Sequence, residues 1–457
     1  MKKINNTTIT TLAFLLVILL ALLIGDIGDN LRAFMRLMEA PGLLLTDHLS
    51  INRDYGGNMN GLIINTFLTT GLSLLIVKFS KTPFEGGVIA SIFTVAGFTF
   101  IGKNVWNVMP LYLGVMLFSK FKGTPLKDSM IVLLLASGFA PVVSYLAFGL
   151  GMAHFDLAFR LPLALIVGVI SGFLIPVMAS HAFNFHKGFN LYNVGFTMGL
   201  TAVGMHGILR SFGIHVRPVA APLEGYPDYT VFLMVTIGAL SLGMIGLAFL
   251  LDKDVVTKYK GLLQETGQLP ANFSQIAGQP ATILNMGVLG VISLLLLVPI
   301  LIVVEIPFLS ILVAGVFTII GFGAFGKHPL NVLPIFTGTL LGFTVITVLD
   351  SPFTTLLPSA NPYGAHLSSL NIHGYTAAIL FATTLAPISK EFGWKAGVIA
   401  GFYHMMVVVI GGNFQGGFNL YNNGWMGGFV AATTVPVFMA FKERKQAKSG
   451  KLAHGTK

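Results

Sequence analysis

The sequence predicts an all-α, polytopic membrane protein with about fourteen transmembrane helices, built as two inverted seven-helix repeats. Three observations support this fold class. The 457 residues are 54% hydrophobic and only 10% charged, with a mean hydropathy of +0.82, whereas soluble domains carry about 25% charged residues. The hexapeptide Gly-Phe-Asn-Leu-Tyr-Asn occurs twice, at 188–193 and 417–422. Finally, the basic residues are divided unequally between alternate loops.

Apolar stretches bounded by glycine, proline and charged residues define the expected spans, because each crossing takes roughly 20 mostly apolar residues. In the first half they cover 10–25, 60–78, 86–101, 105–119, 129–148, 161–180 and 190–210. In the second half they cover 229–251, 281–303, 307–325, 329–348, 372–388, 394–411 and 418–441. The third and fourth are short. They and their repeat counterparts either cross fully or form discontinuous or re-entrant helices.

Two motifs record the duplication at slightly different spacings. An offset of 229 residues aligns the two hexapeptides and pairs Gly195 with Gly424. An offset of 224 aligns two copies of Gly-Lys-x-x-x-Asn-Val-x-Pro, at 102–110 and 326–334. We therefore divide the chain into a first repeat, a second repeat and a basic cytoplasmic tail, which cover 1–228, 229–441 and 442–457.

The positions of Lys and Arg predict the orientation. With a cytoplasmic N-terminus, 20 of the 27 basic residues fall on the cytoplasmic side and 7 outside, as the positive-inside rule requires. Seven spans per repeat is an odd number, so equivalent segments enter the membrane from opposite sides. We expect a protein of the cell (inner) membrane with both termini in the cytoplasm. Its functional site is expected where the inverted repeats meet near the bilayer midplane.

The hexapeptide supplies the first candidate site residues. Two asparagines three residues apart lie on one face of a helix, and each amide can donate and accept hydrogen bonds. If the two copies of the hexapeptide approach from opposite leaflets, their side chains converge, which predicts a site for a polar solute or a cation. Its candidate substrate-binding residues are Asn190, Tyr192, Asn193, Asn419, Tyr421 and Asn422. The alternative is that asparagine and glycine only cap and pack two helices.

The second motif allows two interpretations. Lys103 and Lys327 follow a helix-ending glycine, so each is expected either to cap a helix C-terminus while its side chain extends to the membrane interface, or to belong to a discontinuous helix that lines the site. In the second case Asn107 and Asn331 would present their amides to the substrate.

Few other residues are candidates for chemistry. His404 and Glu305 are possible proton-coupling residues, because ionisable groups within membrane segments are expensive to bury; packing or interfacial roles are the alternative. The chain has no cysteine, which excludes disulfides and Cys-ligated metal sites. We expect no enzyme activity, cofactor or metal, since enzyme motifs are absent. Nucleic-acid binding is not expected either, because the basic residues are scattered through short loops.

At the paired hexapeptides and the paired Gly-Lys-x-x-x-Asn-Val-x-Pro motifs, the chain resembles a family of uncharacterised, internally duplicated multi-pass membrane proteins of Gram-positive bacteria, filed as a domain of unknown function. This resemblance covers nearly the whole chain and implies no substrate. A fainter similarity is to urea channels, whose repeats carry Leu-Tyr-Gly-Phe-Asn-Gly-like and Leu-Pro-x-Phe-Thr-like segments. Residues 191–196 and 333–337 are similar to them. The order and the glycine positions differ, and a seven-span repeat departs from that fold.

The sequence as a whole predicts a transporter of a small polar solute or ion, with its site at the repeat interface. Two alternatives stay open at this point: a channel for a small neutral solute, and a membrane scaffold or sensor that transports nothing. The expected partners are the solute and the lipid bilayer, with a homo-oligomer also possible.

Overall fold

The computed structural model describes residues 20–21, 23–43, 47–49, 58–216, 228–356 and 369–448. Over these residues the regular secondary structure is helical, apart from one isolated β-bridge between Asp47 and Ile101. Most of the first predicted span, at 10–25, and the end of the basic tail lie outside the described residues. The predicted all-α fold class is confirmed.

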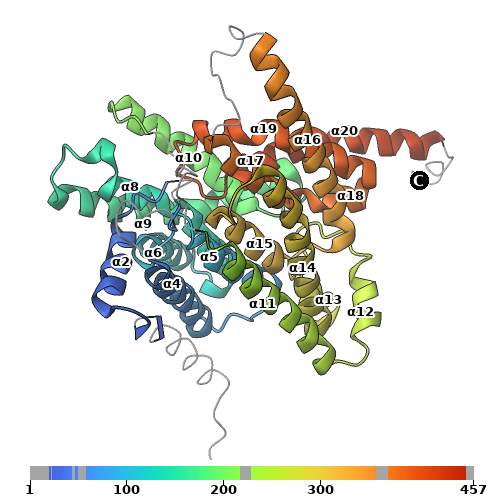
Figure 1. Ribbon diagram of the computed structural model, residues 1–457, viewed down its shortest axis with the longest axis horizontal. Coiled ribbons are helices and arrows are strands. Elements are labelled where there is room, and N and C mark those ends of the chain that lie inside the picture. Colours follow the sequence, from blue (N-terminus) through green and yellow to red (C-terminus); the bar gives the residue numbers. More distant parts are fainter. Residues whose placement is uncertain are drawn as a thin grey trace, which may run out of the picture.

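Each repeat is a succession of helices (Figure 1). Those of the first repeat are α2 (Ile27–Glu39), α4 (Met59–Phe79), α5 (Gly86–Phe98), α6 (Val105–Lys122), α7 (Met130–Ala136), α8 (Ala140–Phe148), α9 (Leu157–His186) and α10 (Asn193–Ser211). Those of the second are α11 (Thr230–Leu251), α12 (Val255–Leu262), α13 (Phe273–Ile276), α14 (Gly278–Val304), α15 (Ser310–Phe322), α16 (Pro329–Leu356), α17 (Ser369–Phe381), α18 (Ala386–Phe392), α19 (Trp394–Phe414) and α20 (Asn422–Lys448).

Equivalent helices carry the repeated motifs and pack in equivalent ways. The helix α6 packs on α9, as α16 packs on α19. The helices α7 and α8 are joined by a 3₁₀ turn at Ser137–Phe139, and α17 and α18 are joined by one at Ala382–Leu385. A proline follows each turn at the second helical position, Pro141 or Pro387, where its missing N–H costs no hydrogen bond. The duplication read from the motifs therefore extends to the details of the fold.

Among the described residues, eight helical segments are long and apolar enough to cross a membrane. They are Met59–Phe79, Leu126–Phe148, Leu157–His186, Thr230–Leu251, Gly278–Val304, Pro329–Ile346, Ile372–Phe392 and Asn422–Ala447. This is the pattern of a multi-pass membrane protein, whereas the total of fourteen spans stays a prediction. The helix α20 also takes up the start of the basic tail, since it continues to Lys448.

Two short helices, α5 and α15, lie side by side near the middle of the molecule (Figure 1). A β-carbon added to Gly97 would lie 3.0 Å from Ala314 Cα, and one added to Gly321 would lie 3.0 Å from the Ala90 carbonyl oxygen. Because the end of each helix meets the first half of the other, the pair is antiparallel. Each has 13 residues, or about 20 Å, which is shorter than the roughly 30 Å hydrocarbon core. Their antiparallel packing agrees with an inverted repeat.

Candidate functional site

The chain turns sharply after each short helix. Gly102 and Gly326 have φ angles of +69° and +107°, which residues with a side chain rarely adopt. The Asn107 amide donates to the Gly102 carbonyl (2.9 Å), and the Asn331 amide donates to the Gly326 carbonyl (2.8 Å). Asn107 also forms a capping box with Asn104 at the start of α6. The two asparagines of this motif therefore hold the turns in place.

The lysines that follow these glycines point into the protein. Lys103 and Lys327 are both fully buried. The Lys103 ammonium donates to Ser137 Oγ (2.8 Å) and Tyr421 Oη (2.6 Å). The Lys327 ammonium donates to Thr383 Oγ1 (2.7 Å) and to Tyr192 Oη. The predicted extension of the lysine side chains to the membrane interface is wrong, because each ammonium bonds residues in the protein interior. One of these residues is a tyrosine from the other repeat.

Aromatic rings complete the surroundings of each ammonium. Lys103 Nζ lies 4.8 Å from the ring centre of Tyr421 and 5.3 Å from that of Phe98. Lys327 Nζ lies 4.5 Å from the ring centre of Tyr192 and 5.3 Å from that of Phe322. These distances are within the range of cation–π attraction. We call Lys103, Phe98, Ser137 and Tyr421 the Lys103 cluster, and Lys327, Phe322, Thr383 and Tyr192 the Lys327 cluster.

Neither cluster contains a carboxylate. In the part of the chain that the structure describes, three ion pairs occur, and they involve Arg32, Lys258 and Lys442. Both buried ammonium groups are therefore held by neutral hydroxyl groups and aromatic rings. A buried charge without a paired counter-charge is expensive, so these two lysines are the least expected feature of the interior.

The hexapeptides meet where the repeats meet. The Asn190 amide donates to the Gly424 carbonyl (2.9 Å), and the Asn419 amide donates to the Gly195 carbonyl (3.0 Å). Nearby, backbone hydrogen bonds join Leu191 to Thr384 and Leu420 to Gly138. Each copy is thus bound to the other repeat by the same bonds. These reciprocal contacts place both copies around one approximate two-fold axis.

The second asparagine of each hexapeptide binds within its own repeat. Asn193 pairs with His186 Nε2 (2.9 Å) and donates to the Ala179 carbonyl (3.0 Å). Asn422 accepts a hydrogen bond from Gln415 (2.8 Å) and donates to the Val408 carbonyl (3.1 Å). In this way Asn193 joins α10 to α9, and Asn422 joins α20 to α19. Their amides are occupied by the protein.

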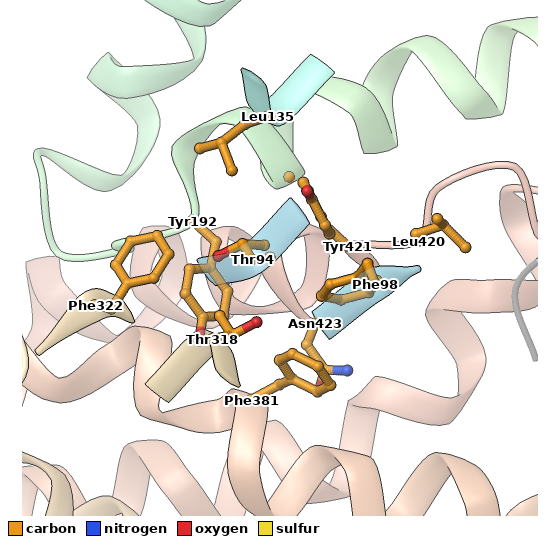
Figure 2. Close-up of a pocket in the computed structure, with 12 residues that line it drawn as sticks. Thr94, Phe98, Leu135, Tyr192, Thr318, Phe322, Phe381, Leu420, Tyr421 and Asn423 are labelled. Carbon is orange, nitrogen blue, oxygen red and sulfur yellow. The ribbon is translucent and has the colours of Figure 1, made fainter. Parts of the chain in front are cut away.

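A small cavity lies on the approximate two-fold axis (Figure 2). Its volume, counted as space open to the centre of a water molecule, is about 20 Å³, which suits one water or a similarly small particle. Equivalent residues from both repeats line it in four pairs: Thr94 and Thr318, Phe98 and Phe322, Tyr192 and Tyr421, Gly195 and Gly424. Members of both lysine clusters thus reach the same cavity.

A family model described as "Protein of unknown function (DUF1576)" matches residues 28–211 and 251–440. The chain belongs to the DUF1576 family. One matched segment falls in each repeat, which is consistent with internal duplication in this DUF1576 chain. No curated protein and no solved structure matches it.

In this DUF1576 chain the structure separates the eight predicted substrate-binding residues into two groups. Tyr192 and Tyr421 line the cavity. The other six, which are Asn107, Asn190, Asn193, Asn331, Asn419 and Asn422, hold backbone or neighbouring side chains by the bonds described above. Sequence reasoning did not assign the two lysines to the cavity, although their recurrence in both repeats was the signal that could have done so.

The two candidate coupling residues are placed differently. His404 is buried, and its Nε2 pairs with Asn423 Oδ1 (3.0 Å). Asn423 itself lines the cavity, so His404 lies directly behind one of the lining residues. Glu305 is exposed at the C-terminal end of α14 and is not among the residues that line the cavity.

Proposed function

We propose that this DUF1576 chain is a membrane transporter of a small polar solute or ion, with its binding site at the interface of the two repeats. One observation supports this proposal most. The cavity on the approximate two-fold axis is lined by the same residue types from both copies, and each lining tyrosine bonds a buried lysine. Inverted-repeat transporters bind their substrates at such an interface.

The proposed topology has fourteen spans in two inverted sets of seven, with both termini in the cytoplasm of the cell. The antiparallel pair α5 and α15 supports the inversion. Without the buried Lys103 and Lys327, the predicted distribution is 19 basic residues on one side and 6 on the other, which supports the orientation. In this arrangement the two short helices end inside the protein, so that the turns after them can contribute polar groups to the site, as broken helices do in transporters.

The experiment is uptake into proteoliposomes that contain the full-length protein, compared with protein-free liposomes. The solute panel contains urea, formamide and glycerol as neutral solutes, sodium and potassium as cations, and chloride, nitrate and formate as anions. We expect one chemical class to enter faster than in protein-free liposomes. Saturable, gradient-coupled uptake identifies a carrier, whereas flux that does not saturate and needs no gradient identifies the channel alternative.

The same panel tests the scaffold or sensor alternative. If no solute of any class moves faster than in protein-free liposomes, while the protein is folded and inserted, the transport proposal is wrong. Fold and insertion are checked by the melting transition and by flotation of the proteoliposomes with their lipid.

A further inference from the structure

Two buried lysines at the centre of this protein are unusual for a membrane interior. Lys103 and Lys327 are fully buried and each gives two hydrogen bonds to neutral hydroxyl groups. Helix C-termini offset part of this charge, because α5 and α15 end just before the lysines and a helix end carries about half a negative charge.

The two carboxylates near the short helices, Asp47 and Glu85, bond other groups. Asp47 accepts hydrogen bonds from the Leu49 backbone and from Ser310 Oγ at the start of α15. Glu85, at the start of α5, accepts hydrogen bonds from Asn272 and Gln275. Both acids thus lie at helix N-termini, where a negative charge is stabilised by the helix dipole. Neither forms an ion pair with a buried lysine.

The geometry points to a binding site for a small monovalent anion between the Lys103 and Lys327 clusters. This inference rests on the transport function proposed above and names its substrate class. A phenol that accepts a hydrogen bond from an ammonium group keeps its own O–H as a donor, and the accepted bond strengthens that donor. Tyr192 and Tyr421 both line the cavity, so the hydroxyl group that each lysine polarises belongs to a residue of the lining.

A third donor completes the polar side of the cavity. Asn423 lines the cavity and pairs with His404 through Oδ1, so its Nδ2 group keeps its two N–H donors. The lining contains tyrosine hydroxyl and asparagine amide groups and no carboxylate, and each lining tyrosine bonds a buried lysine. This combination attracts an anion and repels a cation.

The rest of the lining selects among anions. Phe98, Phe322, Phe381 and Leu135 cover much of the cavity (Figure 2), and its volume is about 20 Å³. An anion must lose most of its water to enter, which is expensive in an apolar environment. Divalent and strongly hydrated anions such as sulfate and phosphate are therefore excluded. Chloride, nitrate and formate carry a single charge, so their loss of water costs less.

The test measures binding and flux with nitrate as the probe. The melting temperature of the purified full-length protein is measured in sodium nitrate and in sodium gluconate of equal ionic strength, since gluconate is too large for the cavity. Flux of nitrate and of urea is measured in proteoliposomes. The variants are Lys103→Met plus Lys327→Met, Tyr421→Phe, and Lys390→Met. The last removes a lysine that bonds the Leu263 carbonyl instead of the cavity tyrosines.

We expect nitrate to raise the melting temperature of the wild type and of Lys390→Met, and to cross the membrane in both. The double lysine variant should bind nitrate at least tenfold more weakly, and Tyr421→Phe about tenfold, since hydrogen bonds to charged groups have about that effect. Because Tyr421→Phe keeps the ring and removes one oxygen, it tests the site even if the double variant does not fold.

Failure of the anion inference and failure of transport give different results. If urea or a cation moves while nitrate, chloride and formate neither bind nor move, the protein is a transporter and the anion inference is wrong. If nitrate stabilises the protein through the lysines but nothing crosses the membrane, the site stands and transport is wrong. An equal nitrate response in the wild type and in both cavity variants would overturn the site.

Discussion

Gly338→Leu is expected to prevent the protein from folding. A β-carbon at this position on α16 would lie 2.1 Å from the carbonyl oxygen of Val398 on α19, and one at Gly114 on α6 would lie 2.2 Å from the carbonyl oxygen of Val169 on α9. Backbone atoms cannot rotate away, so the two helices must separate. Glycine at such crossings lets membrane helices pack closely. We expect a loss of more than about 4 kcal/mol, which is exceptional for one substitution.

The control is Gly207→Leu on α10, where an added β-carbon meets no atom within 4 Å. The elution volume in size-exclusion chromatography and the melting temperature are measured for the detergent-solubilised protein. Gly207→Leu should elute and melt like the wild type, whereas Gly338→Leu and Gly114→Leu should aggregate or melt at much lower temperature. A native-like melting transition for Gly338→Leu would show that the α16–α19 packing is wrong.

Lys103→Met is expected to make the protein more stable in sodium gluconate. The substitution removes a fully buried ammonium that has no carboxylate partner and keeps a chain of similar length among Phe98, Ser137 and Tyr421. Replacing buried charged groups by apolar residues of similar volume often stabilises proteins by about 1–4 kcal/mol. The gain identifies Lys103 as a residue kept for function at a cost in stability.

A loss of stability in Lys103→Met would indicate a structural role for the lysine. If Lys103 mainly ties the second hexapeptide to the first repeat through Tyr421, Lys103→Met should lower the melting temperature, as the loss of a buried hydrogen-bonded group does. Lys327→Met must then behave in the same way, because Lys327 holds Tyr192 by the equivalent bond. Melting curves of both variants in gluconate separate the two roles, and a fall in both would contradict the functional role.

Much of the fold could be predicted from the sequence, because the repeated motifs fall at helix ends. The predicted spans at 86–101 and 307–325 correspond to α5 and α15, although the helices are shorter, at Gly86–Phe98 and Ser310–Phe322. Glycines with a positive φ at 102 and 326 end the turns. Hydropathy does not reveal that a helix stops inside the protein, since the residues beyond its end are also buried.

The site was harder to predict, because its bonds join residues far apart in the chain. Lys103 and Tyr421 are 318 residues apart, and Lys327 and Tyr192 are 135 apart. No local pattern connects them, so the lysines looked like ordinary helix caps. The asparagines were singled out for their recurrence, yet Asn190 and Asn419 recur because each bonds a backbone carbonyl of the other repeat. The repeated motifs correctly indicated the interface between the repeats. Repetition alone could not distinguish the residues that hold this interface together from the residues that line the cavity.

The central claim is that a solute passes between the two inverted repeats through the cavity lined by Tyr192 and Tyr421. Flux of nitrate into proteoliposomes, compared between Tyr192→Phe plus Tyr421→Phe and the control Tyr229→Phe plus Tyr259→Phe, tests it most directly. The control tyrosines do not line the cavity. Losing two hydrogen bonds to an anion should slow flux about 100-fold or more, while the control should match the wild type. Equal flux in the cavity variant and the control would contradict the claim.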